Sequence, residues 1–438
     1  MWAFVRGVLA AALAAALASH AGAEEEVESY AGTLGTRPAL SGDWNGHRTQ
    51  LAERGVTFDL TLTQIAQGIV RGGKDTGWAY GGRGDVVVGA DTEKLGWWRG
   101  GRLSLEFEGS FASDVNKQTG ALNAVNSSQT YPVTDGYGVS ELMLTQLFFR
   151  KLGVVVGKVQ TGSDSNEFAA GKGDVQFFNL ALQFNSAATV TIPYSALGVG
   201  VFWLPTGDEK FAKLKVFVVD SNGKGDSPGF DTVFNGETTY HAEGRVRTLI
   251  SGLTGHQLIG GAYSTKSFTA LEQNVRVVIE DRSLQKTKGS WVLYYNFDQY
   301  LYEPERGSGR GLGVFGRFGV SDGNPNPTKY FYSAGIGGKG VVPGRPLDGF
   351  GIGYYYVTVG HPVFTGPFAS ASLLRDEQGV EAYYDVAITP WARLAPDLQV
   401  VKPAQKRTVG TNQGGVVGGG VKPINTATVL GIRLRLII

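Results

Sequence analysis

Ionisable side chains stand at every second position in several short stretches of this sequence, and they are the residues best suited to bind a solute. In RGDVVVGAD, Arg83 and Asp85 share one parity, while the valines at positions 86 and 88 take the other. In GRLSLEFEGSF, Arg102, Glu106 and Glu108 alternate with leucine and phenylalanine. Guanidinium and carboxylate groups make hydrogen bonds about twice as strong as those of neutral groups. A surface that carries both signs therefore offers strong donors and acceptors without a large net field.

An extended strand places such residues on one face, because successive side chains of a strand point to opposite sides. The last residues, TVLGIRLRLII, follow the same rule, with Arg433 and Arg435 alternating with leucine and isoleucine. A half-exposed sheet of a soluble protein would give this alternation in any single strand. Its repetition along the chain, with almost no helical periodicity, favours a barrel with lipid outside and a watery lumen inside.

The N-terminus predicts export. Arg6 precedes the apolar run GVLAAALAAALA, and the AGA at residues 21–23 forms an A-x-A cleavage site. These features are typical of a secretory signal peptide, so we expect cleavage after Ala23. A membrane-anchor helix is the alternative, but the run is shorter than the ~20 residues that span a bilayer. No later segment approaches 18 consecutive apolar residues, so we expect the mature chain to cross a membrane only as a closed barrel.

The composition agrees with an exported barrel. Gly accounts for 65 of 438 residues, Tyr for 18 and Phe for 23, while Met occurs twice and Cys is absent. The 40 Lys and Arg residues and the 39 Asp and Glu residues become equal in number once Arg6 leaves with the signal peptide. This balance argues against a nucleic-acid-binding or broadly anion-binding surface, so we expect no nucleic-acid partner.

These patterns predict an all-β protein, a transmembrane antiparallel β-barrel of about 16 strands with a short N-terminal helix before the first strand. We assign residues 1–23 to the signal peptide, 24–55 to a periplasmic N-terminal segment and 56–438 to one outer-membrane barrel. The helix is expected in SGDWNGHRTQLAERG, where Asp43 can cap its first turn and Gly55 can end it in a left-handed conformation. Capping rules leave open whether it is a frayed surface helix or a plug at the periplasmic mouth.

Short motifs for catalysis and metal binding lack the surroundings that they need. Residues 311–316 spell G-x-G-x-x-G without a following helix, and residues 225–229 spell G-x-S-x-G in a turn-rich stretch without a strand-to-helix elbow. A faint calcium-loop spacing that begins at Asp220 has Lys224 at a ligand position. The five histidines are too scattered for a zinc motif. We therefore expect no enzyme activity, no cofactor and no metal.

Several long stretches carry a family resemblance. LSGDWNGHRTQLAERGVTFDLTLT, GVFGRFGVSDGNPNPTKYFYSAGIGGKGVVPGRPLDGFGIGYYY, GVEAYYDVAITPWARLAPDLQVVKPA and VLGIRLRLII resemble, in order, segments of the carbohydrate-selective porins of Gram-negative outer membranes. The resemblance implies a sixteen-stranded porin of the cell outer membrane that passes sugars by diffusion. One departure is Ile438, where such barrels usually end in an aromatic residue, and this puts the efficiency of assembly in doubt more than the fold.

The resemblance also directs attention to the narrowest part of the lumen. The lumen-parity candidates on strands are Arg83, Asp85, Glu106, Glu108, Glu141 and Arg317. The segment KVQTGSDSNEFAAGKGDVQFFN resembles the long loop of the family, and its charged residues Asp164, Glu167, Lys172 and Asp174 would lie in the channel if the loop folds inward. The alternative for all of them is ordinary water-facing charge with no part in selectivity.

The leading functional hypothesis is passive, selective diffusion of sugars, monosaccharides such as glucose, with outer-membrane lipid as the other partner. A general or anion-preferring porin is the main alternative. It should show lumen lysines and arginines without carboxylates, whereas Glu106 and Glu108 accompany Arg102 here. A barrel hydrolase and an adhesin without conductance are the remaining alternatives. The identity of the sugar and the choice between a monomer and a homotrimer are left open.

Overall fold

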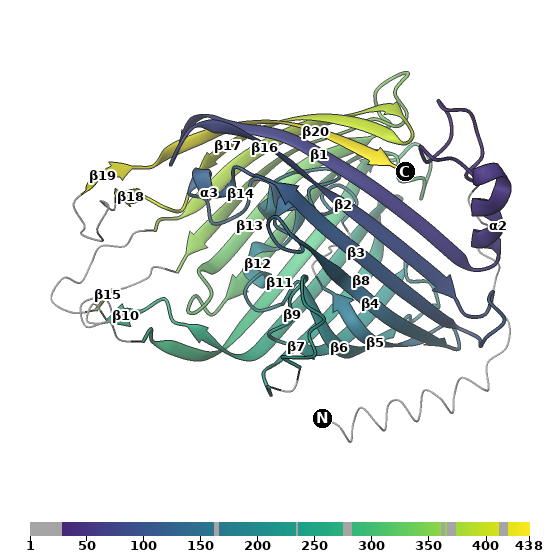
Figure 1. The fold of residues 1–438 in the computed structure, drawn as a ribbon, viewed down its shortest axis with the longest axis horizontal. Helices are drawn as coiled ribbons and strands as arrows, with labels where there is room; N and C mark the ends of the chain where they lie inside the picture. Colours follow the sequence, from purple (N-terminus) through teal and green to yellow (C-terminus); the bar gives the residue numbers. More distant parts are fainter. Residues whose placement is uncertain are drawn as a thin grey trace.

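The protein forms a closed antiparallel barrel (Figure 1). The structure is a computed structural model and describes residues 29–161, 166–233, 235–274, 283–360, 364–365, 374–410 and 419–438. Within those ranges sixteen strands make up the barrel. Each pairs with the barrel strands before and after it in the chain, and the last strand also pairs with the first, which closes the barrel. The predicted barrel and strand number are confirmed, whereas the predicted signal peptide at residues 1–23 lies outside the described residues.

The barrel strands are β1 (Val56–Gly73), β2 (Gly77–Asp91), β3 (Gly101–Ala112), β4 (Tyr137–Phe148), β5 (Leu152–Gln160), β6 (Ser195–Trp203), β7 (Ala212–Asp220), β8 (Thr238–Ile250), β9 (Leu253–Thr269), β11 (Lys286–Tyr302), β12 (Gly311–Ser321), β13 (Thr328–Lys339), β14 (Gly349–Val359), β16 (Glu377–Thr389), β17 (Ala392–Lys402) and β20 (Asn425–Ile437). Two small pairs lie outside the barrel sheet: β10 (Gln273–Asn274) with β15 (Phe364–Thr365), and β18 (Arg407–Gly410) with β19 (Gly419–Pro423). The helical turns are η1 (Trp44–Gly46), α2 (His47–Glu53), α3 (Asn116–Thr119), η2 (Ser127–Gln129), α4 (Leu180–Gln183) and η3 (Ser186–Ala188).

The strands alternate as the sequence pattern predicts. On β20, Leu430 and Ile432 are about 40% exposed on the outer face, while Arg433 is buried on the inner face. The closing register pairs Arg433 with Ile65 of β1. The same rule holds on β2, where Trp78 is exposed and Arg83 is buried. The arginines of the terminal strand therefore face the lumen, and the aliphatic row faces outward.

The two ends of the barrel differ. The segments that follow β3, β5, β7, β9, β14 and β17 are long, whereas those that follow β4, β8 and β16 are tight turns. The N-terminal helix and the C-terminus lie together at the short-turn end (Figure 1). Among the described helices, none is long and apolar enough to cross a membrane.

The short helix predicted before the first strand is present as α2. Asp43 Oδ1 accepts the backbone N–H of Thr49 (2.8 Å), and Gly55 has φ +93°. Arg48 fixes the helix to the barrel, because its guanidinium donates to the carbonyl of Phe58 at the start of β1 (2.6 Å). The helix is therefore docked on the rim and is not frayed.

The hydrophobic core lies inside the barrel, where segments from the long-loop end fold back into the lumen. Phe177 and Leu182 of the β5–β6 segment are buried against Phe315, Tyr355 and other inward residues of β11–β16. The ring centroids of Phe177 and Phe315 are 5.5 Å apart in an edge-to-face arrangement. The lumen is therefore narrowed by a packed segment and is not an open tube.

Candidate functional site

The segment between β5 and β6, described from residue 166 to 194 and here called the inner loop, narrows the lumen. Two arginines of the barrel wall hold its backbone. Arg317 on β12 donates to the carbonyls of Leu182 and Gln183 (both 3.0 Å) and to that of Ala169. Arg433 on β20 donates to the carbonyls of Gly173 (2.8 Å) and Gln176 (3.1 Å). The loop therefore folds inward, which was one of the two arrangements that the sequence left open.

Carboxylate and amide groups complete this attachment. Glu381 on β16 accepts the backbone N–H groups of Phe178 and Asn179, the latter at 2.9 Å. Asn185 donates through its side chain to the carbonyl of Phe318 on β12 (3.0 Å). Polar groups that leave water must find such partners, or each would cost about 1–3 kcal/mol. The inner loop is thus held by matched hydrogen bonds between Ala169 and Asn185.

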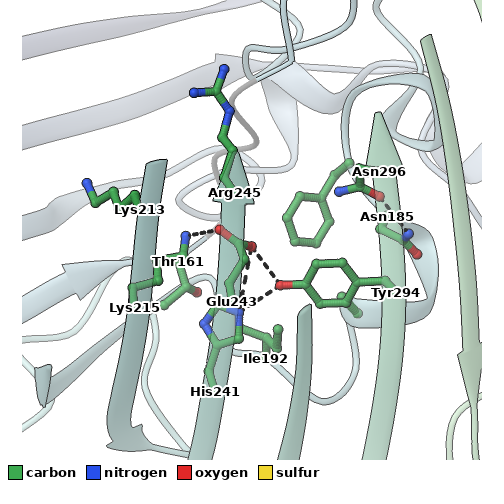
Figure 2. A pocket seen from close by; sticks show the side chains of 12 residues that line it. Thr161, Asn185, Ile192, Lys213, Lys215, His241, Glu243, Arg245, Tyr294 and Asn296 are labelled. Carbon is green, nitrogen blue, oxygen red and sulfur yellow. Dashed lines mark hydrogen bonds and ion pairs between the residues drawn. The ribbon is translucent and has the colours of Figure 1, made fainter. Parts of the chain in front are cut away.

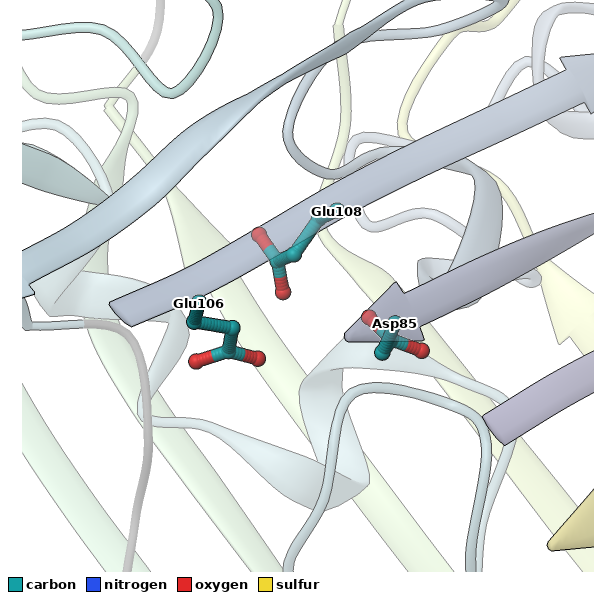
Figure 3. A group of neighbouring side chains, drawn as sticks. All are labelled: Asp85, Glu106 and Glu108. Carbon is teal, nitrogen blue, oxygen red and sulfur yellow. The ribbon is translucent and has the colours of Figure 1, made fainter. Parts of the chain in front are cut away.

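The strand candidates of β2 and β3 meet the inner loop in a charged cluster. Arg83 Nη2 lies 2.6 Å from Glu108 Oε1, and its Nε lies 3.0 Å from Asp85 Oδ2. Lys172 Nζ of the inner loop lies 2.6 Å from Oε1 of both Glu106 and Glu108. Figure 3 shows the three carboxylates projecting from the two adjacent strands. Two cations and three carboxylates therefore share one small volume.

Most of this cluster is closed to solvent. The side chains of Arg83 and Glu108 are 1% and 0% exposed, whereas Glu106 and Lys172 keep 14% and 15%. Oxygens of Asp85, Glu106 and Glu108 lie within 4.8 Å of one another, a separation that a metal ion could bridge. Since Arg83 and Lys172 already make direct ion pairs with them, the arrangement is that of an ion-pair network.

Neighbouring charges shift the pKa values of two inner-loop residues, Asp174 and Lys172. Burial alone would raise the pKa of Asp174, but the charges of Arg435 and Arg83 and a backbone N–H outweigh it, and the pKa falls to about 2. Burial would lower the pKa of Lys172, but Glu108 and Glu106 outweigh it and raise the pKa above its ordinary value. Both groups therefore stay ionised at neutral pH, as their ion pairs require.

The remaining sequence candidates are dispersed. Glu141 on β4 lies directly opposite Glu106 in the register and is half-buried. Glu167 is about 34% exposed and lies 3.9 Å from His256 on β9. Asp164 lies outside the described residues. Arg83, Asp85, Glu106 and Glu108 are thus brought together, and Glu141 adjoins them. Glu167 lies near the start of the described inner loop, and Arg317 holds that loop from β12.

A cavity of about 240 Å³ lies between the inner loop and the wall made by β7, β8 and β11 (Figure 2). At its centre Glu243 is 2.5 Å from Lys215 Nζ and accepts from the Tyr294 hydroxyl (2.8 Å). Because that hydroxyl donates to Glu243, it accepts from His241 Nε2 (2.7 Å). The cavity is lined by Thr161, Phe184, Asn185, Ala188, Ile192, Lys213, Lys215, His241, Glu243, Arg245, Tyr294 and Asn296.

The sequence candidates do not include the strand residues of this cavity. The signal was available, because Lys213 and Lys215 alternate with aliphatics in AKLKVFVVD, and His241, Glu243 and Arg245 share one parity in HAEGRVR. What the pattern could not show is that the inner loop covers the β2–β3 wall closely and leaves space at the β7–β11 wall. That difference depends on where the loop packs.

The comparisons with known proteins agree with this architecture. The family described as carbohydrate-selective porin, OprB, matches residues 75–436. Porin B of Pseudomonas aeruginosa is 23% identical over 441 residues, which cover 91% of this chain and 91% of that protein. A high-pH structure of Pseudomonas putida OprB has a TM-score of 0.74 at 21% identity and covers 94% of this chain and 100% of its own. The low-pH structure of the same protein has a TM-score of 0.56 at 16% identity, over 92% of this chain and 99% of its own. At these identities the structural likeness shows a shared fold.

Proposed function

This chain belongs to the carbohydrate-selective porin family of the Gram-negative outer membrane, and we propose that it admits monosaccharides such as glucose by passive diffusion through the barrel. The family and the fold are those of a channel. The observation that carries the proposal is the cavity beside the inner loop. Positively charged, negatively charged and neutral polar side chains line this one small space, so it offers both hydrogen-bond donors and acceptors.

A sugar that enters a narrow pore loses water and must replace those hydrogen bonds. In the cavity, Glu243 supplies an acceptor, Lys215 supplies a donor, and Asn296 supplies both. Phe184 and Ile192 add apolar surface from the inner loop, which suits the C–H face of a sugar ring. Because Glu243 is already paired with Lys215 and Tyr294, a solute must compete for it. That competition keeps binding weak enough for the sugar to leave.

The charged cluster has a different proposed part. Arg83 and Glu108 are closed to solvent and would act by fixing Lys172 and the inner loop. Glu106, its cross-strand neighbour Glu141, and Glu167 of the inner loop keep part of their surface exposed and stay our candidates for direct contact at the constriction. This division follows from exposure, because a side chain that no water reaches cannot exchange its partners with a passing sugar.

The alternative of a general or anion-preferring pore is favoured by one observation. Lys213, Lys215 and Arg245 line the cavity, and Glu243 is the acidic residue among the residues that line it. A local excess of positive charge would attract anions, even though the whole chain is balanced.

Liposome swelling separates the two possibilities. Vesicles with the purified protein should swell faster in glucose than in an uncharged polyol of similar size, and Glu243→Gln should reduce that preference. Glu209→Gln at the short-turn end, where the side chain is 66% exposed, is the matched control and should leave the preference unchanged. Equal swelling rates in glucose and polyol, together with a strongly anion-selective reversal potential, would establish the alternative.

A further inference from the structure

The inward faces of β7 and β8 carry charged side chains that lie opposite one another across the two strands. Lys215 lies opposite Glu243 in the register, and Lys213 lies opposite Arg245. The first two residues neutralise each other, because Lys215 Nζ lies 2.5 Å from Glu243. The second two are both cations. Like charges directly opposite each other in a sheet are destabilising, so Arg245 is a charge that the fold itself does not need.

Arg245 is the less compensated of these two cations. Lys213 lies 3.4 Å from Glu209, and its Nζ lies 4.8 Å from the centre of the Phe202 ring. Arg245 is half-buried and, among the described residues, makes no hydrogen bond or ion pair. Glu167 of the inner loop interacts with its charge without forming an ion pair. The Arg245 guanidinium is therefore free to bind an anionic group of a solute.

The cavity beside the inner loop is lined by Arg245 as well as by the groups that suit a neutral sugar. The Arg245 guanidinium points away from the Glu243 carboxylate and the Tyr294 hydroxyl (Figure 2). The lining therefore has two chemically different parts along β8. One part offers Glu243, Tyr294 and Asn296 to hydroxyl groups, and the other part is cationic through Arg245 and Lys213.

We propose that this cavity recognises acidic monosaccharides of the hexuronate type, with the carboxylate on Arg245 and ring hydroxyls at Glu243 and Tyr294. The inference rests on the proposed function, because it names a substrate class for the same site. A guanidinium presents paired N–H donors that match the geometry of a carboxylate, which a lysine ammonium does not. A simple anion would use only the cationic part of the lining, and a neutral sugar would use only the other part.

The test measures how solutes block the ion current through the purified mature protein in planar bilayers at constant ionic strength. The probes are glucuronate, glucose, which has the hydroxyls without the carboxylate, and acetate, which has the carboxylate without the hydroxyls. Glucuronate should half-block the current at a concentration about tenfold lower than either of the others, because charge-assisted hydrogen bonds add to those of the hydroxyls. Raising KCl from ~0.1 to ~1 M should weaken the block by glucuronate more than that by glucose.

Variants of Arg245 test the placement of the carboxylate. Arg245→Gln should raise the half-blocking concentration of glucuronate about tenfold, so that it approaches that of glucose. Arg245→Lys should have an intermediate effect, because an ammonium keeps the charge without the planar fork. The matched control is Arg310→Gln, at an exposed site just before β12, which should bind glucuronate as the wild type does. Heat-modifiable mobility shows that each variant folds.

Three results would each overturn the inference. Glucuronate could block no better than glucose, acetate could block as well as glucuronate, or Arg245→Gln could leave the block by glucuronate unchanged. Failure of the proposed function has a different signature, which is equal swelling of liposomes in glucose and in the polyol. The two failures are distinguishable because neither of those solutes carries a charge that Arg245 could bind.

Discussion

Lys172 of the inner loop lies 2.6 Å from Glu108 of β3, although the two residues are 64 positions apart in the chain. The same ammonium lies 2.6 Å from Glu106, so one loop cation neutralises two carboxylates of the wall. Because Glu108 is closed to solvent, its charge depends on Lys172, Arg83 and the Tyr194 hydroxyl for stabilisation. The charges of the barrel wall and the position of the inner loop, which narrows the lumen, therefore depend on the same contact.

Replacing Lys172 with Met should release the inner loop from the β3 wall. Breaking a buried pair leaves an uncompensated charge and costs about 3–5 kcal/mol, less here because Lys172 is partly exposed. We expect a larger single-channel conductance in planar bilayers and a weaker preference for sugar. Adding Glu106→Gln should restore part of the wild-type conductance, whereas Lys210→Met, which removes an exposed cation between β6 and β7, should not enlarge the pore. An unchanged conductance in Lys172→Met would contradict this account.

Acid should weaken the attachment of the inner loop through Asp174. Its pKa is lowered from the ordinary 3.8 to about 2, chiefly because the positive charges of Arg435 and Arg83 outweigh the effect of burial. A lowered pKa means that the ionised carboxylate stabilises the folded state above pH ~4, and this stability is lost as pH falls through about 2. Conductance recorded from pH ~5 to ~2 should therefore rise at the acid end.

Asp174→Asn supplies the check on that titration. The variant should show the higher conductance already at neutral pH and lose the acid-dependent part of the change. Asp208→Asn, an exposed aspartate between β6 and β7, should keep the wild-type profile. Identical acid profiles in Asp174→Asn and the wild type would assign the effect to other carboxylates.

Removing the Arg317 side chain should destabilise the inner loop from the opposite wall. The carbonyls of Ala169, Leu182 and Gln183 would lose their donor, and each buried acceptor left without a partner costs about 1–3 kcal/mol. For Arg317→Ala we expect faster cleavage of the inner loop by protease in detergent and a lower unfolding temperature. Arg310→Ala, at an exposed site just before β12, should leave both unchanged. Resistance to cleavage equal to that of the wild type would show that Arg317 is dispensable for the loop.

Arg48→Ala should affect stability but not transport. Its guanidinium donates to the carbonyl of Phe58 (2.6 Å) and lies 4.0 Å from the centre of the Tyr30 ring, at the short-turn rim. Loss of these contacts should cost about 1–3 kcal/mol, because the buried carbonyl loses a charged donor. Thermal gel-shift measurements should show the loss, while glucose swelling per folded protein stays constant. A change in sugar preference would place the rim in the permeation path.

The sequence by itself determined the barrel and the facing of its strands. Arg433 and Arg435 had to face the inside of the barrel because their neighbours are aliphatic, and the structure confirms this facing. Arg433, however, is closed to water by the inner loop. Period-two alternation is a local property, so it can be read in each strand without knowing which strand is next to it. The short helix was also local. Asp43 accepts the N–H of Thr49 in its first turn, although the residue before the helix is Gly46, and Gly55 follows its end in a left-handed conformation.

Only the tertiary structure decided what those inward residues do. Arg83 and Glu243 have the same alternating signal, yet Arg83 is sealed against the inner loop and Glu243 lines a cavity. The difference depends on the path of the β5–β6 segment, which is fixed by contacts with β12, β16 and β20. Those contacts join residues more than a hundred positions apart, and a strand pattern carries no information about them. A side chain's parity shows that it faces the lumen, but the packing of the inner loop decides whether a solute can reach it.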